Sequence, residues 1–151
     1  MPFVTLELSH SVSQDKSVLN EALLEINRIV QARLKVGSVP VKSRVIRTEE
    51  FCIGDDQEFK GFVYLILECF GGRDRSLLSD LAEELLFLLR QRFARDDLQI
   101  SFAVYIREIE RALTAVYPCR SKPSDLANRT LANGAGISEI MPLRANSLSK
   151  R

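Results

Sequence analysis

The sequence predicts an α+β fold in which two repeated βαβ units form a four-stranded mixed sheet with two helices on one face. Three observations point to this fold class: an internal repeat, two segments with helical apolar spacing, and four segments rich in β-branched and aromatic residues. A shift of 59 residues superimposes Phe3–Leu8 on Phe62–Leu67 and Arg33 on Arg92. Because one shift relates successive elements, the two halves are predicted to share one architecture.

The first half reads as strand, helix and strand. Its first strand is predicted over about Phe3–Ser9. A helix follows over about Ser17–Leu34, because apolar residues recur there every three to four positions and form one stripe. Gly37 is a suitable residue to end this helix, and the next strand is predicted over about Val39–Phe51.

The second half repeats this order after a polar turn that starts near Ile53. A strand is predicted over about Phe59–Phe70, followed by a glycine-containing turn. The second helix is predicted to start at about Ser76, a residue type that is a good N-cap. The last strand is predicted over about Leu98–Ile106.

Both faces of the predicted sheet are rich in apolar side chains, because Phe62–Cys69 and Ile100–Ile106 are apolar nearly throughout. Two helices cover one face, and a sheet that is apolar on both faces needs a second cover. The chain has no further segment to supply it. We therefore expect another subunit to pack on the second face.

The chain is predicted to divide into a βαβ-βαβ domain over residues 1–117 and a tail over residues 118–151. The tail contains proline, serine and asparagine, and its basic residues outnumber its acidic ones. This composition indicates a flexible or loosely docked segment. The alternative is an arm that lies on a neighbouring subunit.

Charge and composition exclude several classes of function. The net charge of +1 argues against nucleic-acid or membrane-surface binding by bulk charge. No apolar run reaches transmembrane length, and the start of the chain lacks the features of a signal peptide. We therefore expect a cytoplasmic protein without a membrane or nucleic-acid partner.

The chain has three cysteines, Cys52, Cys69 and Cys119, and no two of them have metal-ligand spacing. They are expected to be reduced, structural thiols. His10 is the single histidine, so a histidine-rich metal site is not expected. His10 itself is interpreted as a solvated residue at the end of the first strand.

Pro2 is the candidate catalytic residue. If Met1 is removed, Pro2 becomes a secondary amine at the start of a strand. An α-amino group titrates near ~8 in peptides, and burial or nearby cations lower its pKa, which suits a general base at neutral pH. The repeat places Gly61 at the equivalent position, so the scaffold occurs twice and the proline once. Removal of Met1 is essential, because an acylated nitrogen is not basic.

Five short stretches, spread over about residues 2–110, carry a resemblance to a known family. They are Met1-Pro2-Phe3, Lys42-Ser43-Arg44-Val45, Gly61-Phe62-Val63, Asp74-Arg75-Ser76-Leu77 and Ile100-Ser101-Phe102. With the βαβ-βαβ core, their order and spacing resemble the tautomerase superfamily of macrophage migration inhibitory factor and 4-oxalocrotonate tautomerase. Within it, they are most similar to 5-carboxymethyl-2-hydroxymuconate isomerase. The resemblance implies a homotrimer and a cofactor-free 1,3-proton transfer with the terminal proline as the base.

The resemblance also implies cations that hold substrate carboxylates. Lys42 and Arg44 are candidates, and strand alternation puts them on one face. Lysine replaces the arginine that the family tends to carry there, so the charge is kept and the bidentate fork is lost. Arg73 and Arg75 lie before a helix N-terminus, which favours an anion. The register with Ser76 favours Arg75, and both arginines remain candidates.

The sequence therefore predicts an isomerase, a keto-enol tautomerase of an unsaturated 2-hydroxy or 2-oxo carboxylate from aromatic compound catabolism, without cofactor or metal. One alternative is a non-catalytic binding or signalling protein on the same trimeric fold. Another is a ferredoxin-like βαββαβ module that binds a small effector or RNA. For RNA, the strands lack a convincing pair of aromatic stacking motifs.

Overall fold

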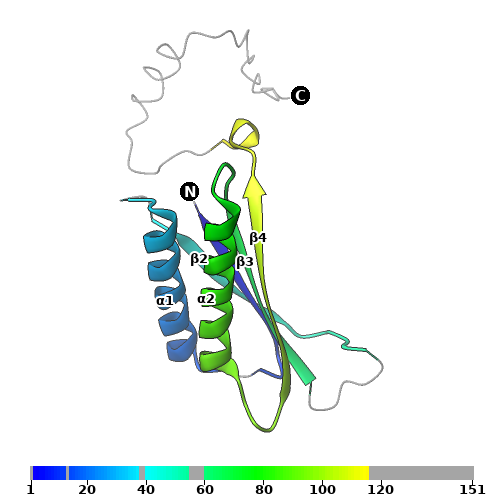
Figure 1. Cartoon of the computed structure of the whole chain (residues 1–151). Helices are drawn as coiled ribbons and strands as arrows, with labels where there is room; N and C mark the ends of the chain where they lie inside the picture. Colours follow the sequence, from blue (N-terminus) through cyan, green and yellow to red (C-terminus); the bar gives the residue numbers. More distant parts are fainter. Residues whose placement is uncertain (1, 13, 38–39, 55–59, 116–151) are drawn as a thin grey trace, which may run out of the picture. The chain divides into compact units, whose positions relative to one another are not determined.

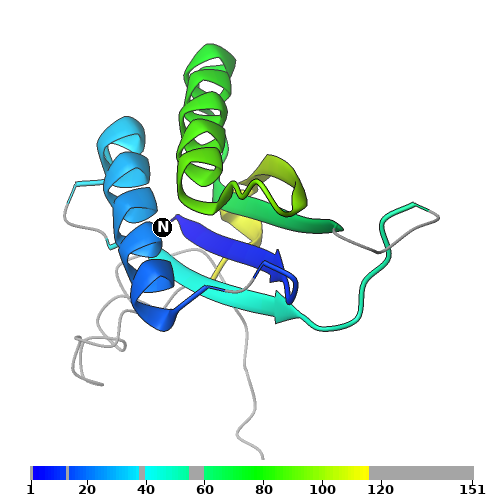
Figure 2. The same cartoon turned by 90° about the horizontal axis from the view of Figure 1, so that it is seen from below.

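The computed structural model describes residues 2–12, 14–37, 40–54 and 60–115. They form a four-stranded sheet with two helices packed on one face (Figure 1). In the view from below, both helices lie on the same side of the sheet (Figure 2). The predicted α+β fold class is thus confirmed. Met1, Cys119 and the predicted tail over residues 118–151 lie outside the described residues.

The strands and helices alternate as predicted. Their bounds are β1 (Phe3–Ser9), α1 (Lys16–Leu34), β2 (Lys42–Thr48), β3 (Lys60–Phe70), α2 (Arg75–Phe93), β4 (Gln99–Ile109) and a short 3-10 helix η1 (Arg111–Leu113). The strand order is β2-β1-β3-β4. Strand β1 runs parallel to β2, β3 runs parallel to β4, and β1 runs antiparallel to β3, which makes the sheet mixed.

The internal repeat is visible in the backbone. Both helices have 19 residues, and their first residues, Lys16 and Arg75, are related by the 59-residue shift. In the antiparallel pair, Leu6 faces Leu65, its own repeat-equivalent. An approximate twofold axis therefore passes between these two residues and relates the halves of the sheet.

The core lies between the sheet and the two helices. Alternate residues of the central strands point toward the helices and are almost fully buried, including Val4 and Leu6 of β1 and Leu65 of β3. They meet the apolar stripes of the helices, represented by Ile26 of α1 and Leu85 of α2. Each such side chain contributes about 1.5–3 kcal/mol by leaving water.

Two ion pairs join the helices on their outer side, and the repeat relates them. Arg33 Nε lies 2.6 Å from Glu84 Oε2, and Arg92 Nη2 lies 2.5 Å from Glu25 Oε2. The 59-residue shift carries Arg33 onto Arg92 and Glu25 onto Glu84. All four side chains are partly exposed, so each pair contributes at most about 1 kcal/mol.

Two predicted boundaries are wrong in detail, and Gly37 is not the residue that stops α1, although α1 ends at the predicted Leu34. The N-cap of α2 is Asp74, whose carboxylate accepts a 2.7 Å hydrogen bond from the Ser76 N–H and so satisfies a free donor of the first turn. Helix α1 ends before Gly37, because Lys35 already takes the left-handed conformation with φ 48°. Strand β2 is shorter than predicted, because it is an edge strand whose only partner, β1, has 7 residues.

Neither α1 nor α2 covers the second face of the sheet. It carries a chain of ring contacts in which Phe62 stacks on Tyr64 and Tyr64 meets Tyr105 edge-on. Tyr105 is 49% exposed, and Ile46 on the same face is 37% exposed. This is the face on which the sequence predicts that another subunit packs. No described helix is long and apolar enough to cross a bilayer.

Candidate functional site

Pro2 lies at one end of the sheet and is buried. Its carbonyl oxygen accepts a 3.3 Å hydrogen bond from the Lys42 N–H, which extends the pairing of β1 with β2. Alternation along β1 places Pro2 on the same face as Val4, toward the helices. The end of β3 and the first turn of α2 lie at this end of the sheet (Figure 1).

The strand register puts a thiol and a carboxylate in line with Pro2. Phe3 pairs with Glu68, so one further step of the antiparallel register places Pro2 beside Cys69. Cys69 in turn pairs with Glu108 of β4. Paired residues of neighbouring strands point to the same face, so Pro2, Cys69 and Glu108 form a row beneath the helices.

The turn between β3 and α2 brings Arg73 to this row. The half-buried Arg73 side chain folds back, and its guanidinium donates a hydrogen bond to the Phe70 carbonyl oxygen. The pKa of the Cys69 thiol depends on the charges around it. Burial raises its pKa, the Arg73 guanidinium opposes that rise, and the Glu108 carboxylate adds to it. Arg73 and Glu108 therefore both act electrostatically on the residue beside Pro2.

Arg75 has different surroundings. It is the first residue of α2, it is exposed, and it makes no hydrogen bond or ion pair with the described residues. The structure therefore turns Arg73 toward the Pro2 end of the sheet and leaves Arg75 in solvent. The sequence position relative to Ser76 favoured Arg75, but a position in the sequence does not determine the direction of a side chain.

Lys42 and Arg44 share one face of β2, but it is the face opposite to Pro2. They pair with Phe3 and Thr5, whose side chains point away from the helices. Both cations are exposed. Arg44 Nε donates to Thr5 Oγ1 at 3.2 Å, and its guanidinium lies 5.2 Å from the centroid of the Phe3 ring. Within this chain, the side chains of these two cations point to the face of the sheet opposite to the Pro2 side chain.

Sequence reasoning missed Glu108. A signal was available in the repeat, since the 59-residue shift relates Glu108 to Glu49 and Cys69 to His10. A carboxylate therefore occurs at this position of both halves. Its proximity to Pro2 could not be recognised without the register of β1, β3 and β4.

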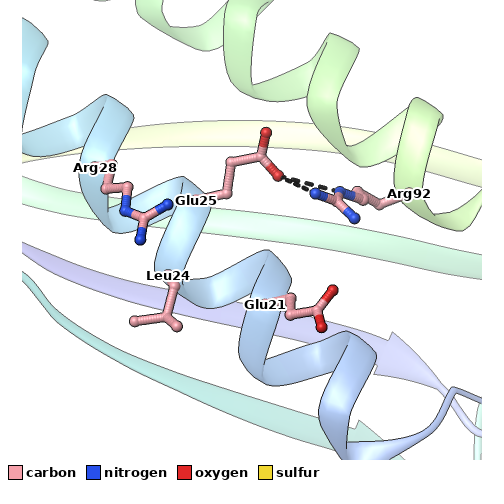
Figure 3. Close-up of a pocket in the computed structure, with 5 residues that line it drawn as sticks. All are labelled: Glu21, Leu24, Glu25, Arg28 and Arg92. Atoms are coloured by element: carbon pink, nitrogen blue, oxygen red, sulfur yellow. Dashed lines mark hydrogen bonds and ion pairs between the residues drawn. The ribbon is translucent and has the colours of Figure 1, made fainter.

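The cavities that described residues line lie away from Pro2. One, of about 310 Å³, lies on the outer side of α1 and α2 and is lined by the residues drawn in Figure 3, including the Glu25–Arg92 ion pair. Arg92 belongs to the C-terminal end of α2, whereas Pro2 lies near its N-terminal end. Of its polar lining, Glu25 and Arg92 join the two helices, whereas Glu21 and Arg28 make no such contact with the described residues.

Another cavity, of about 450 Å³, lies between the start of α1 and β2. A further one, of about 420 Å³, is lined by His10, Ser11, Glu49, Glu50 and Phe51. His10 Nδ1 lies 2.9 Å from the Glu49 carbonyl oxygen, and the exposed imidazole meets the Phe51 ring edge-on. Among the described residues, no group of three His, Cys, Asp or Glu side chains is placed to hold a metal ion. Cys52 is an exposed free thiol, unlike the buried Cys69.

Comparisons with known proteins agree with this architecture. The family model described as 5-carboxymethyl-2-hydroxymuconate isomerase matches residues 2–116. A 5-carboxymethyl-2-hydroxymuconate isomerase from Deinococcus radiodurans R1 superposes with a TM-score of 0.68 at 23% identity, covering 77% of this chain and 88% of that one. No curated protein sequence matches the chain.

Two further solved structures share the fold at lower identity. A macrophage migration inhibitory factor-like protein from Entamoeba histolytica has a TM-score of 0.58 at 13% identity, covering 77% of this chain and 95% of that one. A fused 4-OT, described as a wild-type symmetric trimer, has a TM-score of 0.57 at 10% identity, covering 76% and 92%. At these identities the likeness shows the fold alone.

Proposed function

Because the chain belongs to the 5-carboxymethyl-2-hydroxymuconate isomerase family, and is thus an isomerase, we propose that it is a cofactor-free tautomerase of unsaturated 2-hydroxy or 2-oxo carboxylates. The base is the amine of Pro2 after removal of Met1. The observation that carries this proposal is the buried position of Pro2 in one row with Cys69, next to the turn that holds Arg73.

The surroundings of Pro2 favour a neutral amine. The Glu108 carboxylate favours the ammonium form, whereas burial and a nearby guanidinium disfavour it and lower the pKa of the amine. The positive end of the α2 dipole acts in the same direction. Cys69 bears no charge in its ordinary state, because burial raises the pKa of its thiol. Pro2 therefore has the unprotonated nitrogen that a general base needs at neutral pH.

The reaction needs one base and one cation. The Pro2 nitrogen takes the proton of the enol hydroxyl group, or a proton from the carbon next to the carbonyl, and leaves a delocalised dienolate. The Arg73 guanidinium pairs with the substrate carboxylate and stabilises the developing negative charge. Pro2 then returns its proton to another carbon of the conjugated system. No atom is lost or gained, so the product is a tautomer of the substrate.

We further propose that the protein assembles as a homotrimer through the uncovered face of its sheet. The exposed Ile46 and Tyr105 side chains on that face support the proposal, and another copy of the chain would remove them from water. Lys42 and Arg44 lie on the same face and are then available to a site shared with a neighbouring subunit. Arg75 is assigned the outer rim of the site, where it attracts anionic substrate.

The test begins with the intact mass of the protein purified from cells, which shows whether Met1 is removed. The same sample is assayed with phenylenolpyruvate and with 2-hydroxymuconate, beside Pro2→Ala. We expect Pro2→Ala to lower kcat/KM by about 10²–10⁴-fold, the usual contribution of a general base.

Pro40→Ala is the matched control, because Pro40 is exposed and precedes the edge strand β2. It should leave activity unchanged. Retention of Met1, or equal activity of Pro2→Ala and the parent protein, would refute the amine-base mechanism. The second candidate, a binding or signalling protein on the same fold, would then be preferred.

A further inference from the structure

We infer that Glu108 is a specificity-determining residue of the Pro2 site, where its carboxylate accepts a hydrogen bond from the 2-hydroxyl group of the substrate. This inference deepens the proposed function and rests on it for the location of the site. Its basis is the placement of Glu108 in the fold, its contacts with the β3–α2 turn and the charges on either side of Cys69.

The register places Glu108 across the site from Pro2. Cys69 is fully buried, pairs with Glu108 on one side and lies beside Pro2 on the other. The backbones of β1 and β4 are thus two strand spacings apart, about 10 Å. This spacing suits a small planar carboxylate whose one end meets the base and whose other polar groups reach Glu108.

Contacts with the turn direct the Glu108 side chain toward the same end of the sheet. A Cβ atom placed on Gly71 would lie 3.5 Å from Glu108 Oε1 and 3.8 Å from Glu108 Cβ, so the side chain runs along this glycine. The Gly71 N–H donates a 3.2 Å hydrogen bond to the Ile109 carbonyl oxygen, which fixes the turn against β4. Glu108 therefore borders the turn that carries Arg73.

The oxygens of Glu108 are available to a ligand. Glu108 is exposed and makes no hydrogen bond or ion pair with any described residue, Arg73 included. Its charge nevertheless acts on Cys69 in the direction opposite to that of Arg73. One cation and one acceptor of opposite charge thus lie near Cys69 at this end of the sheet.

This arrangement distinguishes the polar groups of a 2-hydroxy carboxylate. The guanidinium of Arg73 attracts the carboxylate, whereas the carboxylate of Glu108 repels it and accepts a hydrogen bond from a hydroxyl group. A ligand with both groups is held in one orientation. A ligand without the 2-hydroxyl group loses the contact with Glu108 and keeps the contact with Arg73.

The experiment uses two ligands that cannot tautomerise, 2-hydroxy-3-phenylpropanoate and 3-phenylpropanoate, which differ only in the 2-hydroxyl group. Dissociation constants are measured by calorimetry with the full-length protein. We expect the parent protein to prefer the hydroxylated ligand by about 10-fold or more, as a hydrogen bond to a charged group provides. In Glu108→Ala this preference should disappear while the affinity for 3-phenylpropanoate stays the same or rises. Glu108→Gln, which keeps an acceptor, should retain part of the preference.

Glu68→Gln is the matched control, because Glu68 precedes Cys69 in β3 and points to the opposite face. It should leave both dissociation constants unchanged. An unchanged preference in Glu108→Ala, or an equal loss of affinity for both ligands, would overturn the inference. Because neither ligand is turned over, this result is independent of the Pro2→Ala kinetics. Failure of the base mechanism and failure of the Glu108 assignment are therefore separable.

Discussion

The two ends of the sheet begin from the same backbone plan and differ in the space that they leave. The repeat relates Pro2 to Gly61 and Gly71 to Val12. At the second end, a Cβ atom on Gly61 would lie 2.9 Å from Val12 Cγ2 and 2.8 Å from Ser11 Oγ, so the loop after β1 fills this position. At the first end, the equivalent of Val12 is a glycine without a side chain. At the first end, the larger residue Pro2 therefore occurs together with the small residue Gly71 in the neighbouring turn.

Charge differs between the two ends as well. Arg73 at the Pro2 end corresponds to Gln14 at the other, while the carboxylates Glu108 and Glu49 correspond to each other. The first end thus combines Pro2, an arginine of the turn and a carboxylate, whereas at the second end the cation near Gln14 is Arg47 of β2, which donates to the Gln14 carbonyl oxygen. The comparison teaches that the duplicated scaffold supplies the strand ends and the carboxylate, whereas a few substitutions turn one end into a candidate active site.

After Pro2→Ala, the largest expected effect comes from giving the Pro2 end the residue found at the other end. Arg73→Gln should lower kcat/KM by about 10–100-fold, because a charge-assisted hydrogen bond to the substrate carboxylate is lost. Gln14→Arg should not change activity. Steady-state kinetics with phenylenolpyruvate measures both. Arg75→Gln is the matched control and should have the smaller effect; a larger loss in Arg75→Gln than in Arg73→Gln would show that the exposed arginine binds the substrate.

The next effect concerns stability at the other end. Gly61→Ala should lower the free energy of unfolding by about 1–3 kcal/mol, because the new methyl group meets Ser11 and Val12 and forces a local shift. Urea unfolding measures the change. Gly71→Ala is the control, since its nearest neighbour, Glu108 Oε1, lies at an ordinary 3.5 Å. Equal destabilisation by the two substitutions would contradict the difference in space between the ends.

The smallest effect distinguishes the helix caps of the two halves. Asp74 caps α2, and the hydrogen bonds from Ser76 lower the pKa of its carboxyl group, whereas the equivalent Asp15 makes no such side-chain bond at α1. Asp74→Ala should therefore lower the thermal midpoint at pH 7 more than Asp15→Ala does. Because the folded-state pKa of Asp74 is depressed, its contribution is present above the unfolded-state pKa of 3.8 and is lost as pH falls through the folded-state value.

Thermal unfolding at pH 7 and at about pH 2.5 provides the measurement. The difference between Asp74→Ala and the parent protein should shrink at the acidic pH. A difference that is the same at both pH values would show that the charge of Asp74 has no part in the cap.

Much of the fold could be predicted because it depends on local patterns. The helical spacing of apolar residues and the repeat locate both helices, and α2 starts one residue from the predicted Ser76. Strand ends were less predictable. The length of β2 depends on the length of β1, its partner. The sequence pattern of β2 alone does not show how long its partner strand is.

The candidate site was predictable only in part. Pro2 stands out by its position in the chain, and Lys42 and Arg44 share a face as strand alternation requires. Whether Lys42 and Arg44 lie on the same face of the sheet as Pro2 depends on how the sheet packs against the helices. The structure puts them opposite to Pro2 within the protomer, and it distinguishes Arg73 from Arg75 by the fold of a turn.

The sequence by itself determined the repeat, the order of the elements and the proline at position 2, which the second repeat lacks, because periodicity and position along the chain are local properties. Tertiary structure alone decided which residues accompany Pro2. Cys69 and Glu108 are distant from it in the chain and meet it through the registers of two strand pairs. Register depends on backbone hydrogen bonds between strands and on the burial of one face of the sheet. These are interactions between segments, and they set the composition of the site.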